Sequence, residues 1–244
     1  LRLSNSTRSP NLNFILFRSI FNHYNWYNQN LKDQKTSNAH FNIAYKDLIK
    51  ISADYYILDN YTYFKETTNS LTGEIDAKRL ASPFQAPDQI KYYKIKIENH
   101  NRFGKFALIN TAQYQKKEQK EIDTNELPTL NVPEWVTRNT LLYSNDLFNN
   151  SLFIQTGITF NFFTKFYADY YNPVLSEFVT QNYKEIGEYP RLDFFVNATI
   201  QQTRIFVKVE HLNSSFTGYD YYSDPFNPYR DLSVRFGVVW NFFE

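Results

Sequence analysis

The sequence lacks cysteine and methionine, and it has only six glycines among its 244 residues. Without cysteine, the chain has no disulfide framework, no thiol nucleophile and no thiolate ligand for a metal. The few glycines are scattered, which excludes the glycine-rich loop that cradles phosphate groups in nucleotide-binding proteins. The formal net charge is +1 and both signs are spread along the chain, so we expect no nucleic-acid partner.

Long hydrophobic runs are also missing. The longest uninterrupted apolar runs span only a few residues, whereas a membrane-spanning helix requires about 20. Aromatic residues, in contrast, are abundant: 23 phenylalanines, 20 tyrosines and three tryptophans make up 19% of the chain. Phe and Tyr favour strands, and helix-favouring alanine is scarce. Composition therefore predicts an all-β protein without membrane-spanning helices.

The C-terminal segment alternates between apolar and polar residues. Its apolar positions are Leu232, Val234, Phe236, Val238, Trp240 and Phe242. A period of two indicates a strand with one apolar and one polar face. A tilted strand needs about 9 to 11 residues to cross a bilayer, which matches this segment, whereas strands average about five or six residues in soluble proteins.

The same alternation recurs upstream, in segments 41–45, 49–57, 93–98, 152–162, 192–200 and 204–210. The last two are separated by a short polar turn and predict a long hairpin. We count about ten to twelve such segments in the chain and no helix of convincing period. The pattern predicts a transmembrane antiparallel β-barrel, to which this chain contributes these strands.

The connections between the predicted strands alternate in length. We expect short turns at 46–48, 99–101, 149–150 and 201–202, and long polar loops at 26–39, 64–90, 115–138 and 213–230. Short turns at one end and longer loops at the other are typical of outer-membrane barrels. We interpret the charged run 116–126 as a solvated loop insertion.

Aromatic residues gather near the ends of the predicted strands. Amphipathic rings prefer the headgroup layer of a membrane, so these clusters predict an interfacial girdle. Its candidate residues are Trp26, Tyr167, Tyr170, Tyr171, Trp240, Phe242 and Phe243. The alternative is a soluble β-protein that uses its aromatic residues for packing or for stacking on sugars.

Charged residues of the strands alternate with the apolar ones and therefore belong to the opposite face. The candidates for a lumen-facing position are Lys94, Lys96, Glu98, Asp193, Arg204, Lys208, Glu210 and Arg235. On the lipid face, each Arg or Lys would cost about 2 to 4 kcal/mol at mid-depth. Two roles are open for these residues: a network of ion pairs that braces the lumen, or a lining that sets the size and charge preference of a pore.

The sequence contains no recognisable catalytic or metal-binding pattern. The four histidines, His23, His40, His100 and His211, stand far apart, and none has a second histidine two or four residues away. We expect each of them at the surface or rim. Glu210 and His211 are adjacent on a predicted strand and face opposite sides, so they form no direct catalytic pair. We therefore expect no enzymatic activity, no cofactor and no metal.

Several motifs of the C-terminal half, together with Val136–Asn139, carry a family resemblance. They are Leu152–Gly157 (LFIQTG), Phe166–Pro173 (FYADYYNP), Gly187–Pro190 (GEYP), Arg204–His211 (RIFVKVEH), Pro228–Asp231 (PYRD) and the closing Arg235–Phe243 (RFGVVWNFF). Together they resemble the putative-porin family of outer-membrane β-barrels, known from Gram-negative bacteria of the Bacteroidota type. The first 64 residues are similar more weakly, through Asn25-Trp26 and Asp59–Phe64. One departure is Glu244, because barrels of this kind usually end on an aromatic residue.

The resemblance implies an outer-membrane location, contact with the lipid bilayer and lipopolysaccharide, and a passive channel for small hydrophilic solutes. Family members are longer on the N-terminal side, and the chain starts without methionine. We therefore expect residues 1–244 to be the C-terminal portion of a single, larger barrel domain.

Two other interpretations stay open. One is a non-conducting barrel that serves as a structural or accessory subunit of a larger outer-membrane complex for secretion or uptake. The other is a soluble β-rich protein that binds carbohydrate.

Overall fold

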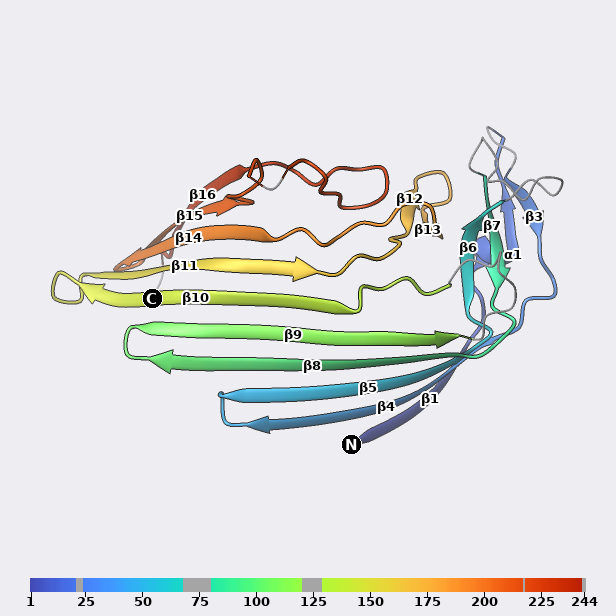
Figure 1. Cartoon of the computed structure of the whole chain (residues 1–244), viewed down its shortest axis with the longest axis horizontal. Coiled ribbons are helices and arrows are strands. Elements are labelled where there is room, and N and C mark those ends of the chain that lie inside the picture. The colour runs from blue at the N-terminus through green and yellow to red at the C-terminus, as the bar shows by residue number, and fades with distance from the viewer. Residues whose placement is uncertain (21–23, 68–79, 120–128, 217, 243–244) are drawn as a thin grey trace.

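The computed structural model describes residues 1–20, 24–67, 80–119, 129–216 and 218–242. A ten-stranded antiparallel sheet forms most of the molecule (Figure 1). In spatial order its strands are β1 (Arg2–Arg8), β4 (Gln34–Tyr45), β5 (Ile49–Asp59), β8 (Ile90–Phe103), β9 (Phe106–Gln119), β10 (Trp135–Leu147), β11 (Leu152–Phe163), β14 (Arg191–Ile200), β15 (Thr203–Glu210) and β16 (Ser233–Trp240). The prediction of an all-β antiparallel protein is confirmed. Among the described residues, β1 and β16 are the open edges of the sheet, so the sheet is not closed.

The two ends of the sheet differ in their connections. The turns between β4 and β5, β8 and β9, β10 and β11, and β14 and β15 are short, and all lie at one end, here called the short-turn end. The strand directions place the beginning of β1 and the end of β16 at this same end. The connections at the opposite end, the long-connection end, are all much longer. The predicted alternation of short and long connections is therefore present.

Several predicted boundaries are wrong. The predicted turn at 99–101 lies within β8, and the chain reverses at Gly104 and Lys105, where Gly104 adopts a φ of +61°. Three consecutive polar residues resemble a turn, but here they alternate between the two faces of a strand. The predicted loops 26–39 and 115–138 are also too long, because β4 already begins at Gln34 and β9 continues to Gln119. The part of the charged run beyond Gln119 lies outside the described residues.

The long-connection end carries a small folded unit, here called the cap (Figure 1). It contains a four-stranded sheet with the order β12 (Tyr170–Asn172), β13 (Glu177–Thr180), β6 (Thr62–Glu66) and β7 (Ala81–Gln85), a two-stranded sheet of β2 (Leu16–Arg18) and β3 (Asn25–Tyr27), and the short helix α1 (Leu12–Ile15). Parallel pairing of β13 with β6 joins segments that are far apart in the sequence. No helix within the described ranges is long and apolar enough to cross a membrane.

The cap contains the hydrophobic core. The buried residues of this core are Tyr24, Phe64, Ala81, Tyr170, Leu175 and Val179, and half-buried Phe14, Phe17, Trp26 and Leu80 pack against them. Phe64 is 1% exposed and its ring stacks on that of Phe14, with 4.5 Å between the centroids. Sequence periodicity did not predict this unit, because its strands are too short to show an alternation.

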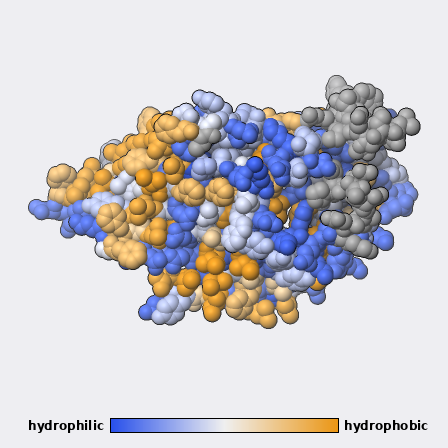
Figure 2. Space-filling model, in the orientation of Figure 1, coloured by the Kyte–Doolittle hydropathy of each residue, from blue (hydrophilic) through white to orange (hydrophobic). Residues whose placement is uncertain are grey.

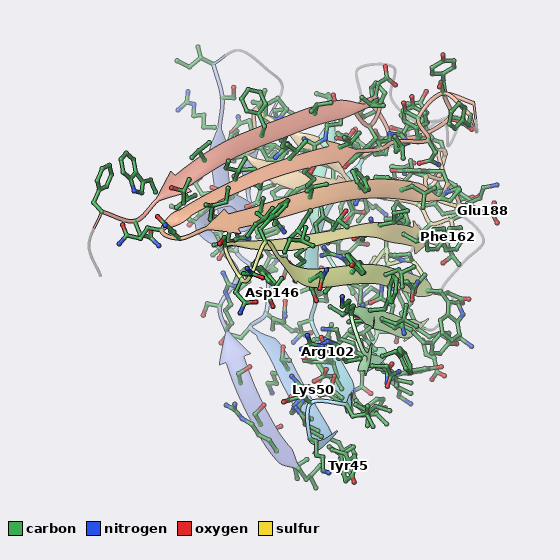
Figure 3. All side chains as sticks on the ribbon, turned by 90° about the vertical axis from the view of Figure 1, so that its left-hand side faces the viewer. Tyr45, Lys50, Arg102, Asp146, Phe162 and Glu188 are labelled. Atoms are coloured by element: carbon green, nitrogen blue, oxygen red, sulfur yellow. The ribbon has the colours of Figure 1, made fainter. Side chains whose placement is uncertain are left out.

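The register divides the side chains of the ten-stranded sheet between two faces. Figure 3 shows Lys50, Arg102 and Asp146 on the concave side of the curved sheet, and Tyr45 and Phe162 on the convex side. Large apolar residues of the convex face are exposed, including Phe236 at 80% and Val238 at 64%. Figure 2 shows hydrophobic residues over the short-turn end of this face and along its lower edge. The described chain therefore offers no second layer that covers this apolar face.

Two glycines allow close packing on the concave face. Gly157 pairs with Phe195 across β11 and β14, and Gly237 pairs with Phe206 across β15 and β16. A Cβ at position 157 would lie 2.5 Å from the backbone oxygen of Leu141 and 2.9 Å from Cζ of Phe195. The three atoms nearest to a Cβ at position 237 all belong to the ring of Phe206, the closest being Cε1 at 2.5 Å.

We predict that Gly157→Ala lowers the free energy of unfolding by about 1 to 3 kcal/mol, because the added methyl group forces a backbone shift. Gly237→Ala should cost less, since the Phe206 ring can rotate away. Urea unfolding of the protein refolded into lipid vesicles, monitored by tryptophan fluorescence, measures both. A Gly157→Ala variant as stable as the wild type would contradict the described packing.

Candidate functional site

The charged residues that the sequence assigned to one face do share a face. Glu98 pairs across the strands with Thr111, and Thr111 with Arg138. Arg138 continues the row through Asn161 to Arg191, two residues before Asp193 on β14. Asp193 and Lys208 belong to the same face through Phe195, and Lys208 pairs with Arg235. All eight candidates, Lys94, Lys96, Glu98, Asp193, Arg204, Lys208, Glu210 and Arg235, therefore lie on the concave face.

Two carboxylates anchor a network on β14, β15 and β16, here called the C-terminal cluster. Glu210 Oε1 lies 2.8 Å from Lys208 Nζ, and Glu210 Oε2 lies 3.1 Å from Arg235 Nε and 2.8 Å from Arg230 Nη2. Asp193 Oδ2 lies 4.0 Å from Lys208 Nζ, so Lys208 bridges both acids.

Three further residues contact Asp193, and one of them, Asn161, donates a hydrogen bond from Nδ2 to Oδ2 at 3.4 Å. Arg191 Nε lies 3.8 Å from Asp193 Oδ1, and the backbone N–H of His211 donates a hydrogen bond to the same oxygen at 3.0 Å. These contacts compensate for the burial of the carboxylate.

Burial separates the two signs of charge in this cluster. The side chains of Asp193 and Glu210 are only 8% and 9% exposed, whereas those of Lys208, Arg230 and Arg235 are 39%, 47% and 53% exposed. The acids are held inside the network, and the cations extend from it. With Arg191, four cations surround two carboxylates, so the exposed part of the cluster is positively charged.

A second group, the N-terminal cluster, lies on β4, β5 and β8. Asp54 is 2.7 Å from His40 Nδ1 and 3.2 Å from Lys94 Nζ. Glu98 is 2.6 Å from Lys96 Nζ and 3.7 Å from Lys50 Nζ. Three of the sequence candidates, Lys94, Lys96 and Glu98, thus belong to this cluster, whereas their partners Asp54 and Lys50 on β5 were not among those candidates. The sequence could have predicted that Asp54 and Lys50 lie on the polar face, because both alternate with the apolar residues of segment 49–57.

A cavity of about 790 Å³ lies along the concave face next to the C-terminal cluster. Its polar lining includes Thr111, Arg138, Thr140, Thr159, Asp193, Asn197, Lys208, Glu210 and Arg235. Uncharged hydroxyl and amide groups thus lie between the charged side chains. Such a surface offers hydrogen bonds to water and hydrophilic solutes without a tight set of ligands for one molecule.

Arg204 lies apart from both clusters. It belongs to the same face of β15 as Lys208 and Glu210, but it is nearer the short-turn end, opposite Thr199 and Val239. Within the described ranges, no ion pair includes Arg204. Of the two roles left open by the sequence, the ion-pair network therefore does not include Arg204 among the described residues.

The prediction that all histidines lie at the surface is wrong for His211. This residue is 0% exposed, and its ring lies edge-on to Tyr221 with 4.6 Å between the centroids. It has a φ of +54° just after the end of β15, so it no longer obeys the alternation of the strand. The hydroxyl of Tyr221 donates a hydrogen bond to Asp231, which raises the pKa of Tyr221 to about 12.

Two of the other histidines lie in the part of the chain that the structure describes. His40 pairs with Asp54 and His100 is exposed, while His23 lies outside the described residues. Across the part of the chain that the structure describes, no group of three or more potential ligands could hold a metal ion.

The predicted interfacial aromatic residues fall into two groups. Trp26 and Tyr170 belong to the core of the cap, where burial against other rings takes the place of contact with an interface, so their prediction as girdle residues is wrong. Tyr167 is half-buried in the same connection, and Tyr171 is exposed there beside Phe178.

The remaining predicted aromatic residues are near the C-terminus. Trp240 and Phe242 are exposed at the short-turn end and stack on each other, with 4.7 Å between the ring centroids. Phe243 lies outside the described residues.

Other aromatic residues form two rows on the convex face that were not predicted. Toward the long-connection end, Tyr114 contacts Tyr93 on β8 and Trp135 on β10, at centroid distances of 6.4 and 4.9 Å. Toward the short-turn end, the ring centroids of Phe106 and Tyr143 are 5.1 Å apart. One available signal was the alternation of segment 135–143, which was obscured because the predicted loop 115–138 included its first four residues.

Comparison with known proteins agrees with this architecture. No curated protein matches the sequence. Among solved structures, the chain is similar to the FrpB iron transporter from Neisseria meningitidis (F3-3 variant), with a TM-score of 0.51 and 14% sequence identity. That match covers 86% of this chain and 31% of the transporter chain, so this chain spans about a third of the length of that protein. The sequence model of the family described as putative porin matches residues 1–244, and the chain therefore belongs to the putative porin family.

Proposed function

We propose that the chain forms part of an outer-membrane β-barrel that acts as a porin-like channel for passive diffusion of small hydrophilic solutes. The observation that carries this proposal is the division of the large sheet into two faces. Both ion-pair clusters lie on the concave face, and the uncovered apolar residues lie on the convex face. A bilayer would cover the apolar convex face, while water fills the space in front of the charged concave face.

The dimensions of the strands support a membrane-crossing role. Aromatic residues mark both ends of the convex face on the central strands, Phe106 and Tyr114 on β9 and Trp135 and Tyr143 on β10. Each pair is separated by eight positions, which corresponds to about 27 Å along a strand and less when the strand tilts. An apolar band about 25 Å tall, flanked by aromatic residues, is what an outer-membrane barrel presents to lipid.

The charges of the concave face suggest a preference of the channel for anions. The acids of the C-terminal cluster are buried in ion pairs, and its exposed groups are cations. Arg204 and Arg138 add positive charge on the same face. A lumen lined in this way lowers the free energy of an anion relative to a cation of equal size.

The alternative is a non-conducting barrel that serves as a structural or accessory subunit of a larger outer-membrane complex. The cap favours it, because a folded unit with its own core lies at the long-connection end, where solutes would enter. In that case the ion pairs of the concave face stabilise the barrel and do not line a channel for solutes. Neither function requires catalysis or a cofactor.

Recording from planar bilayers separates the two functions. We expect the full-length protein, extracted from membranes in detergent and migrating in a heat-modifiable manner on gels, to give stepwise conductance increases. A protein that inserts without conductance steps would favour the non-conducting subunit. Solubility without detergent would contradict both membrane functions.

Charge reversal at Arg204 tests the lining. We predict that Arg204→Glu shifts the reversal potential in a salt gradient toward cations, because Arg204 lies on the concave face with no ion pair among the described residues to break. Lys105→Glu is the matched control, since Lys105 lies in the turn between β8 and β9 and makes the same charge change outside the concave face. Equal reversal potentials for the wild type and Arg204→Glu in an open channel would remove Arg204 from the lining.

A further inference from the structure

A polar patch interrupts the apolar convex face at β8, β9 and β10. Asn99 pairs across the strands with Asn110, and Asn110 with Asn139, so three amide side chains form a row on one face. Asn101 and Thr137 belong to the same face and extend the row. These five residues are here called the asparagine patch. Figure 2 shows hydrophilic residues across the middle of this face.

The patch lies in the middle of the apolar band. Asn110 is four positions from both Phe106 and Tyr114, and Asn139 stands in the same relation to the aromatic residues of β10. The apolar Leu108 and Leu141 adjoin it on the short-turn side. Aromatic rings mark the two headgroup layers, so the centre between them is the position where water is scarcest.

The hydrogen-bonding capacity of the patch is only partly used. Asn101 Nδ2 donates to Asn99 Oδ1 at 2.6 Å, and Asn139 Nδ2 donates to Thr137 Oγ1 at 2.9 Å. Asn99 Nδ2 donates to the backbone oxygen of Leu48 at 3.0 Å, and the Thr137 hydroxyl donates to the backbone oxygen of Thr111 at 3.1 Å. Each amide carries two N–H groups and a carbonyl, and Asn110 makes no side-chain hydrogen bond to any described residue. In hydrocarbon, groups of this kind require a partner.

We propose that the asparagine patch is the contact site for a second copy of this chain within the membrane. This inference rests on the proposed function, because only a membrane-spanning sheet places the convex face in lipid. The patch is neutral and every amide both donates and accepts. Two copies related by a two-fold axis therefore complement each other, because the Asn110 amide of one copy can pair with the side-chain oxygens of Asn101, Asn110 or Asn139 of the other.

The surroundings of the patch fit a second copy better than a charged partner. The outward-facing charges nearest to it, Lys91, Lys116 and Glu118, lie beyond the aromatic row toward the long-connection end. On β8, β9 and β10, the described outward-facing residues at the centre of the apolar band therefore include no charge that could pair with a charged partner. Ile97 and Leu141 flank the amides and provide apolar contact around the hydrogen bonds.

Disulfide trapping tests the contact, because the chain has no cysteine of its own. Asn110→Cys in the full-length protein, oxidised in membranes, should give a disulfide-linked species of twice the mass of the chain. Val207→Cys is the matched control: it lies on the convex face of β15, four strands away from β9, and should remain monomeric. A double variant, Asn110→Leu with Asn139→Leu, should lose most of the dimer seen by native mass spectrometry while it still inserts.

The outcomes separate this inference from the proposed function. Heat-modifiable, inserted protein that forms no Asn110→Cys dimer and has a monomeric mass overturns the second-copy contact alone. Failure to insert overturns both proposals. A cross-linked product of another mass assigns the patch to a different membrane protein and overturns the second-copy contact. Equal cross-linking of Asn110→Cys and Val207→Cys indicates random collision and overturns it as well.

Discussion

The structure depends on one constraint: the ten-stranded sheet has a hydrophobic face with no protein layer to cover it among the described residues. In soluble proteins, such a face is buried against a helix or a second sheet. Here the buried core lies in the cap, and the sheet leaves residues such as Phe236 and Val238 exposed. Period-two alternation then decides the rest, because every charge that cannot face lipid must point to the concave side.

On the concave side, acidic and basic side chains differ in burial. Asp193 and Glu210 are buried and held in ion pairs, so they act as anchors for Lys208, Arg230 and Arg235, whose side chains stay partly exposed. Removing an acid would leave several cations to repel one another, whereas removing an outer cation would leave the network largely intact. The proposed lining is therefore rigid in its acids and variable in its cations. The cap, held by its own aromatic core, forms at the end where the long connections meet.

The features that depend on alternation could be predicted from the sequence, and those that depend on tertiary packing could not. Long strands such as β11 and β14 are correct to within about a residue, and the eight charged candidates share a face as expected, because parity survives errors in strand length. The cap was not predicted, since its pairings join distant short segments such as β13 and β6. Burial of Tyr170 and His211 was also missed, because contacts between distant segments decide it. Asn99 and Asn101 were mistaken for a turn because polar residues are unexpected on a lipid-facing strand.

Single cysteines along β9 test whether one face of the sheet meets water and the other meets lipid. Each position from 106 to 114 is replaced in turn by cysteine in the full-length protein, which is then inserted into vesicles. In one experiment the cysteine is exposed to a charged thiol reagent. In a second, it carries a fluorescent reporter, and a quencher attached to the lipid is added. We expect alternation along the strand. Cysteines at Ala107, Ile109, Thr111 and Gln113 should react with the charged reagent from water, whereas those at Leu108, Asn110 and Ala112 should be quenched from lipid or shielded by a neighbouring chain. Uniform reactivity with the charged reagent along β9 would contradict it.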